Sequence, residues 1–186
     1  MVDYTKIISI DPGNSGGIAI WTNRSIHVTP MPIITTQKPG KRKADKPKNI
    51  NTTDVEAIQR MLREQMEGHW VLLIIEKVTS RPSDLDSPGK IFQIQKMLAN
   101  VEALMTVIKL SGVDYVEVMP RVWQKALNLT KDKNAYKAFA QEKYPMLKVT
   151  LKTADAICIL LFCRLKLKTD PKWIESRVNR KENNLI

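Results

Sequence analysis

Short runs of apolar residues near the start of the chain predict β-strands. Branched apolar residues dominate the runs at 6–11, 16–21 and 26–31, and four polar residues separate the second run from the third. These runs predict an antiparallel meander. Two later runs, at 71–76 and 113–119, predict further strands. The run at 71–76 is almost entirely apolar, which is typical of a central strand covered on both faces.

Apolar residues recur at helical spacing through much of the remaining chain. Val55, Ile58 and Leu62 mark the first helix, and Thr53 with Glu56 three residues later has the form of a capping box. The other predicted helices cover 89–110, 120–127, 131–143 and 153–165. This order of elements predicts an α/β fold, in which helices flank a five-stranded mixed sheet made of the meander and parallel strands.

The length of the chain bounds its organisation. We expect the 186 residues to form one domain at 1–165 and a polar, basic tail at 166–186. The Pro- and Lys-rich stretch at 36–50 is expected to be a loop of that domain. No apolar run is long enough for a membrane span and the first residues lack a secretion signal, so we expect a cytoplasmic protein with no membrane partner.

Cysteine usage argues against two kinds of stabilising site. Cys158 and Cys163 are the only cysteines, and they lie five residues apart in an apolar run. A zinc site or a disulfide framework needs a different spacing and more ligands. We therefore expect two buried thiols.

The net charge of +11 is concentrated in two segments and suggests a polyanionic partner. Residues 38–48 contribute +5 and residues 164–186 contribute +4. Flexible basic segments release counterions from nucleic acids, so DNA or RNA is the leading partner, while the charge by itself fits a role in solubility equally well. An anionic membrane fits less well, because neither segment interleaves large apolar residues with its charges.

Three acids occupy positions where burial is expected. Asp11 and Glu76 end apolar runs, and Asp155 falls in the first turn of an apolar helix. If the first and fourth strands lie side by side and parallel, Asp11 and Glu76 emerge together at the sheet edge where α/β folds bind ligands. A buried carboxylate needs compensation, and three hard oxygen ligands suit Mg²⁺ or Mn²⁺. Taken singly, Asp11 before Pro-Gly could be a turn residue, and Asp155 could complement the helix dipole.

Four motifs in order resemble those of RuvC-type Holliday junction resolvases, particularly the phage-associated branch. They are ISIDPG at 8–13 with Gly17, IIEKV at 74–78, VMPRVWQKAL at 118–127 and TADA at 153–156. The resemblance spans residues 5–165. It implies a ribonuclease H-like fold, a homodimer in a bacterial or phage-infected cell, and Mg²⁺-dependent cutting of branched DNA. It also implies that Asp11, Glu76 and Asp155 bind one or two Mg²⁺ ions, for which Mn²⁺ substitutes.

Lysines near the last two motifs differ in how well they match the family. Bacterial members carry an acid or a histidine three residues before the last Asp, whereas this chain has Lys152. Lys152 could contact the scissile phosphate beside a weakened metal site, or the register could be imperfect and another group could serve there. It could also be an exposed surface lysine. By resemblance, Lys133 stabilises charge at the cleaved phosphate. Lys125 lies one residue out of register with another basic position of the family.

Further basic residues are candidates for contacts with the DNA arms. Lys41, Arg42 and Lys43 lie in the basic loop, where phosphate contacts would add affinity without sequence information. Arg81 and Lys90 flank the loop after Glu76, which in this family faces the centre of the junction. Since that loop also contains acids, we expect it to read the shape of the DNA.

The sequence therefore predicts a crossover junction endodeoxyribonuclease without a small-molecule cofactor. A water activated at the three carboxylates attacks the phosphodiester in line, and two sites of a dimer joined through the helix at 89–110 cut opposed strands. Two alternatives remain: a debranching nuclease of broad specificity, and a junction-binding protein that cuts weakly or not at all. An actin-like phosphotransferase needs a second domain that 186 residues do not supply.

Overall fold

The computed structural model describes residues 3–39, 47–79 and 87–180, and a five-stranded mixed sheet forms its centre. The strand order is β3-β2-β1-β6-β7. The strands are β1 (Lys6–Ile10), β2 (Gly17–Thr22), β3 (Ile26–Pro30), β6 (Val71–Glu76) and β7 (Asp114–Val118). The pairs β1/β2 and β2/β3 are antiparallel, whereas β1/β6 and β6/β7 are parallel. The predicted mixed sheet and its meander are confirmed.

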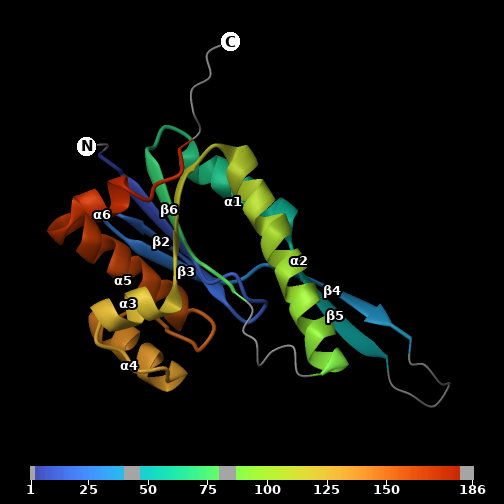
Figure 1. Cartoon of the computed structure of the whole chain (residues 1–186). Helices are drawn as coiled ribbons and strands as arrows, with labels where there is room; N and C mark the ends of the chain where they lie inside the picture. Colours follow the sequence, from blue (N-terminus) through green and yellow to red (C-terminus); the bar gives the residue numbers. More distant parts are fainter. Residues whose placement is uncertain (1–2, 40–46, 80–86, 181–186) are drawn as a thin grey trace, which may run out of the picture.

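Helices cover both faces of the sheet (Figure 1). One face carries α1 (Val55–Met66) and α2 (Pro88–Ser111); the other carries α3 (Pro120–Ala126), α4 (Lys133–Lys143), α5 (Ala154–Thr169) and α6 (Pro171–Glu175). Side chains alternate along each strand, so Ile7 packs in the α5 layer and Ile8 in the α1/α2 layer. Leu72 and Leu73 divide in the same way, which explains why β6 is apolar throughout.

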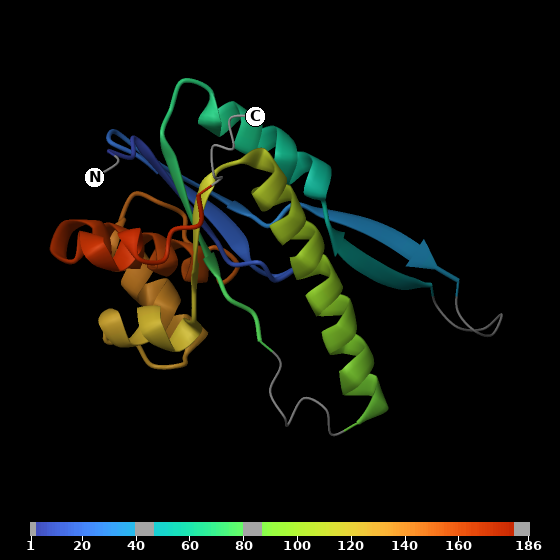
Figure 2. The same cartoon turned by 45° about the horizontal axis from the view of Figure 1, so that its top comes forward.

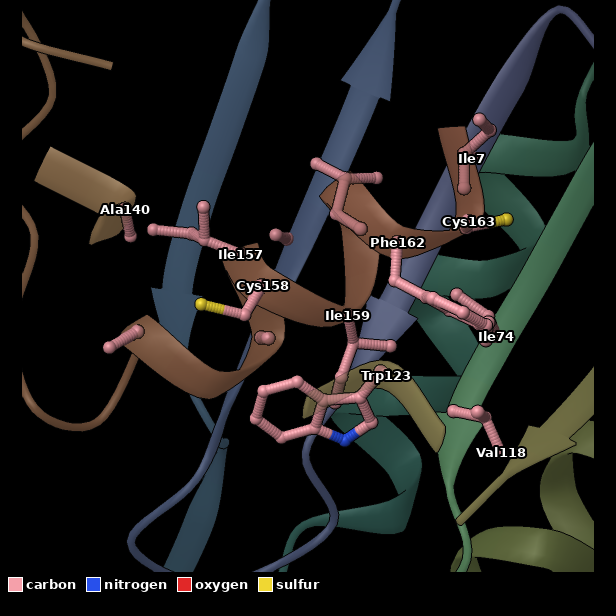
Figure 3. Close-up of a cluster of buried hydrophobic side chains, with 14 of the residues drawn as sticks. Ile7, Ile74, Val118, Trp123, Ala140, Ile157, Cys158, Ile159, Phe162 and Cys163 are labelled. Atoms are coloured by element: carbon pink, nitrogen blue, oxygen red, sulfur yellow. The ribbon is translucent and has the colours of Figure 1, made fainter. Parts of the chain in front are cut away.

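The helix α5 forms the middle of one layer. Each of its residues from Ala154 to Leu160 is buried. Figure 3 shows its side chains packed with Trp123, Ile7 and Ile74. The buried Ser9 hydroxyl on β1 donates a hydrogen bond to the carbonyl oxygen of Ala156 at 2.7 Å, which fixes the start of α5 against the central strand.

Both cysteines lie in this layer. Cys158 and Cys163 are free thiols on α5 and are fully buried, which confirms the prediction. Burial raises the pKa of each thiol to about 12. Such thiols are poor nucleophiles at neutral pH. In the described part of the chain, no helix is long and apolar enough to cross a membrane.

A two-stranded hairpin projects from the body of the protein (Figure 2). It pairs β4 (Ile33–Lys38) with β5 (Lys48–Thr53) in antiparallel register. The loop predicted for 36–50 is therefore wrong at both ends, where the chain is in strands. The hairpin carries mostly Thr, Asn and Gln side chains and lies outside the main sheet, so it has no apolar alternation that would have predicted it.

The helix α1 begins one residue later than the predicted capping box implies. Asp54 is the N-cap, and its carboxylate accepts a hydrogen bond from the backbone N–H of Ala57 at 2.9 Å. Thr53 cannot fill this role because it ends β5, paired with Ile33. The capping box prediction is therefore wrong.

The C-terminal region is more ordered than predicted. The helix α5 continues to Thr169, so the expected boundary at 165 falls inside it. The short helix α6 follows, with Ile174 buried and the Trp173 ring 5.2 Å from the Phe162 ring. The sequence did not predict this continuation, because Lys and Leu residues alternate there and half of the positions are polar. The signal available was that no helix-breaking residue occurs before Pro171.

Candidate active site

The parallel pairing of two neighbouring strands places Asp11 and Glu76 side by side. Ile10 on β1 is in register with Ile75 on β6, so the acid after each isoleucine lies at the same edge of the sheet. The helix α5 starts beside this edge and carries Asp155 in its first turn. The three acids act on one another: the charge of Asp155 raises the pKa of both Asp11 and Glu76. The predicted convergence of the three elements is thus present.

Two glycines allow the chain segments around Asp11 and before α5 to pack closely. A methyl group at Gly16 would overlap the carbonyl oxygen of Asp11 and lie 2.7 Å from its Cγ. A methyl group at Gly17 would lie 2.7 Å from the carbonyl oxygen of Lys152 and 2.9 Å from that of Thr29. The loop after Asp11 therefore packs against its own carboxylate, and the segment before α5 packs against β2.

Burial makes the three carboxylates costly to ionise. The pKa of Asp11 is raised from 3.8 to about 6, chiefly by burial and further by Asp155. The pKa of Glu76 is raised from 4.5 to about 7 by burial and by Asp11. Burial also raises the pKa of Asp155, although the neighbouring Lys133 opposes the rise. A cation placed among the acids would remove this cost.

Lys133 supplies part of that positive charge. Its Nζ lies 3.4 Å from Asp155 Oδ2, and it lowers the pKa of all three acids. Lys133 is the first residue of α4 and its side chain is largely exposed, whereas the Asp155 side chain is largely buried. The other oxygen, Asp155 Oδ1, is buried and accepts no hydrogen bond from any described residue. The site thus leaves a buried carboxylate oxygen without a donor from any described residue.

Trp123 holds the second acid in place. Its indole Nε1 donates a hydrogen bond of 2.8 Å to Glu76 Oε2, and its ring meets the Tyr136 ring edge to face at 5.1 Å. Trp123 is 1% exposed, so it also belongs to the core. The sequence did not reveal the contact with Glu76, because it joins residues 47 positions apart. The signal available was that β7, which lies beside β6 in the sheet, leads directly into α3.

Substituting Trp123 with Phe should raise the pKa of Glu76 above about 7 by roughly one unit or more. The indole N–H stabilises the ionised carboxylate, and losing a hydrogen bond to a charged group costs about 1.5–3 kcal/mol. Carbon-13 NMR titration of the side-chain carboxyl measures the shift. Trp70→Phe, at a residue that is 67% exposed, is the control. An unchanged titration of Glu76 in Trp123→Phe would show that the bond does not tune this acid.

A cavity of about 550 Å³ opens beside the acids. Glu76 and Asp155 line it together with the cations Arg121, Lys131 and Lys133. Arg121 and Lys131 were not predicted as site residues. Arg121 stands in the motif at 118–127, so its position next to Pro120 was the signal available. A cavity lined by both acids and cations suits a phosphate bound next to a metal.

The three carboxylates have the ligand chemistry that a hard divalent cation requires, but they are not arranged as a metal site. Three carboxylates with raised pKa values and an unpaired Asp155 Oδ1 are suitable oxygen ligands for Mg²⁺. Among the described residues, however, no three His, Cys, Asp or Glu side chains lie close enough together to form a metal site. Binding an ion there would therefore require these side chains to rearrange.

Of the remaining predicted residues, three are exposed and four lie outside the described residues. Lys152 is exposed and forms no ion pair with Asp11, Glu76 or Asp155. Lys125 is exposed at the end of α3 and does not line the cavity. Lys90 is exposed in the first turn of α2, where its backbone N–H donates to Ser87 Oγ. Outside the described residues lie Lys41, Arg42, Lys43 and Arg81.

The sheet and its two helical layers constitute a RuvC-like fold of the ribonuclease H type, as predicted. Two solved structures of Thermus thermophilus RuvC share it. One, in complex with a Holliday junction substrate, has a TM-score of 0.53 at 12% identity, covering 90% of this chain and 97% of that one. The other has a TM-score of 0.52 at 14% identity, covering 95% and 99%. No protein-family model and no curated protein matches the sequence.

Proposed function

We propose that this protein is a structure-selective endonuclease that resolves Holliday junctions and other branched DNA. The observation that carries the proposal is the meeting of Asp11, Glu76 and Asp155 at one edge of a RuvC-like sheet. A nuclease of this kind needs paired acids and a cationic wall for the phosphate, and both line the same cavity. The net charge of +11 supports a polyanionic substrate.

The three acids, Trp123 and Lys133 have different parts in the proposed reaction. Asp11, Glu76 and Asp155 would hold one or two Mg²⁺ ions, which, when bound, lower the pKa of a water and stabilise the departing oxygen. Trp123 fixes Glu76 through Oε2, so Oε1 is the oxygen that remains to take up a proton or to bind the cation. Lys133 would move from Asp155 to the scissile phosphate, where its charge offsets the charge that develops during attack.

A homodimer would place two such sites on one junction. All four buried residues of α2 lie between Val101 and Ile108, in its C-terminal half. Its N-terminal half extends past the sheet (Figure 1) and leaves Phe92 68% exposed. An apolar helix end of this kind is suited to pairing with a second copy, which would allow symmetric cuts in opposed strands.

The experiment that tests the proposal is cleavage of synthetic four-way, three-way and linear DNA by the purified protein with Mg²⁺. We expect paired cuts in the four-way junction and little cutting of the linear duplex. Equal cutting of three-way and four-way substrates would favour the debranching nuclease. Uncut four-way and three-way substrates would reject the endonuclease.

A junction-binding protein with weak cleavage is the second candidate. One observation favours it: no three His, Cys, Asp or Glu side chains of the described residues form a group that could hold a metal ion. Binding to four-way DNA in a chelator, followed by addition of Mg²⁺ or Mn²⁺, separates the two functions. Binding without cleavage at any concentration of either ion would identify the second candidate.

Neutralising Lys41, Arg42 and Lys43 together should flatten the salt dependence of junction binding. Each phosphate contact contributes about 0.9 to the slope of log affinity against log salt, so the slope should fall by up to about 2.7. Substitution by Gln is preferable to deletion of 38–48, because Lys38 and Lys48 pair at the end of the hairpin.

The control for this triple variant removes three exposed charges elsewhere: Arg60→Gln, Arg63→Gln and Lys109→Gln on α1 and α2. Binding is measured by fluorescence anisotropy over a series of salt concentrations. If both triple variants keep the slope of the original protein, the basic loop serves solubility and not DNA binding.

A further inference from the structure

A second polar groove adjoins the candidate active site. It has a volume of about 380 Å³ and lies between the loop after Asp11, the strand β5 and the helix α2. A third cavity of about 430 Å³ adjoins the active-site cavity, with which it shares Glu76, Thr79 and Pro120, and Gly13 and Met97 line it as well. Gly13 and Met97 also line the second groove. The three cavities therefore lie next to one another beside the three acids.

The helix α2 presents a polar stripe to this groove. Gln93, Lys96 and Asn100 follow the i, i+3, i+7 spacing of a single helix face, and all three line the groove. None of their side chains forms a hydrogen bond or an ion pair with a described residue. A stripe that served only to pack α2 against the body would be apolar. This one presents a cation and two amides without protein partners.

The opposite wall of the groove contains another amide with an unpaired atom. Asn14, in the loop after Asp11, donates from Nδ2 to the carbonyl oxygen of Asn51 at 3.0 Å, which ties that loop to β5. Asn14 Oδ1 is buried and accepts no hydrogen bond from any described residue. An unpaired buried acceptor costs free energy, so a donor brought into the groove would stabilise this wall.

We propose that this groove is a DNA subsite that holds the nucleotides next to the scissile phosphate, an inference that rests on the proposed endonuclease function. Lys96 is placed to bind a backbone phosphate. The unpaired carboxamides of Gln93 and Asn100 both donate and accept, as base edges require, and Gln and Asn are the side chains that pair with adenine. The groove would thus contribute affinity through Lys96 and cut-site preference through its amides.

The test uses the full chain with Lys96→Ala and with Gln93→Ala/Asn100→Ala. Alanine maintains the helix, so these variants should fold. The matched controls are Lys109→Ala and Gln95→Ala, at exposed positions of the same helix outside the groove. Two readouts are taken: binding to four-way junctions in a chelator over a salt series, and the distribution of cuts in junctions with randomised bases at the crossover.

We expect Lys96→Ala to weaken junction binding and to lower the salt slope by about 0.9. The double variant should change discrimination among bases beside the cut by roughly 5- to 150-fold. If only Lys96→Ala has an effect, the phosphate contact stands and base reading is rejected. Variants that match their controls in both readouts overturn the subsite while the endonuclease stands. A wild-type protein that binds no branched DNA rejects both.

Discussion

Glu76→Gln should lower the rate of DNA cleavage by roughly 10³-fold or more, while the affinity for the junction stays within a few fold of wild type. The substitution keeps the size of the side chain and an oxygen that can accept the indole N–H of Trp123. It removes the charge that a bound cation requires, and the loss of a metal ligand costs several kcal/mol of transition-state stabilisation. Single-turnover cleavage of a four-way junction with saturating Mg²⁺ measures the rate.

The matched control is Glu102→Gln, an exposed acid on α2. Binding is measured separately in a chelator, so that loss of the reaction is distinguished from loss of the complex. We expect Asp11→Asn to behave as Glu76→Gln does. Cutting at the wild-type rate by either variant would remove that acid from the mechanism.

Asp11→Asn should also make the metal-free protein more stable at neutral pH, by about 3 kcal/mol at most. Folding raises the pKa of Asp11 from 3.8 to about 6, so the folded state binds this proton more tightly than the unfolded state. The resulting stability is complete below pH 4 and is lost as the pH rises through about 6. At pH 8 the ionised carboxylate therefore destabilises the fold, and Asn removes that cost.

Urea denaturation in a chelator at pH values from 4 to 8 measures this effect. The fall in free energy of unfolding between pH 4 and pH 7 should be shallower in Asp11→Asn than in wild type. Glu67→Gln, at an exposed position, should retain the wild-type slope. A variant that is less stable than wild type at pH 8 would mean that the charge of Asp11 is already compensated within the fold.

The main sheet and the meeting of the acids could be predicted because they depend on local signals. Unbroken apolar runs before Asp11 and Glu76 identify central strands, and parallel neighbours must end at one edge. Asp155 in the first turn of α5 follows from the apolar periodicity of that helix. Each of these inferences needs only a window of the sequence and a rule of sheet topology.

Features that depend on distant contacts or on exposed polar residues could not be predicted in this way. The hydrogen bond from Trp123 to Glu76 joins α3 to the end of β6. The relative position of these two elements depends on how α3 packs against the sheet. The hairpin of β4 and β5 has no buried face of its own that an alternating pattern would reveal. Lys133 was expected near the phosphate, but its pairing with Asp155 depends on where α4 docks against α5.

The bond between Trp123 and Glu76 has a practical consequence. Indole emission responds to nearby charge, and Trp123 is fully buried with its N–H directly on the carboxylate. The chain has four tryptophans, and replacing Trp21, Trp70 and Trp173 with Phe would leave this one as the single fluorophore. Its intensity would then follow the ionisation of Glu76 and the arrival of a cation in solution, without any DNA present.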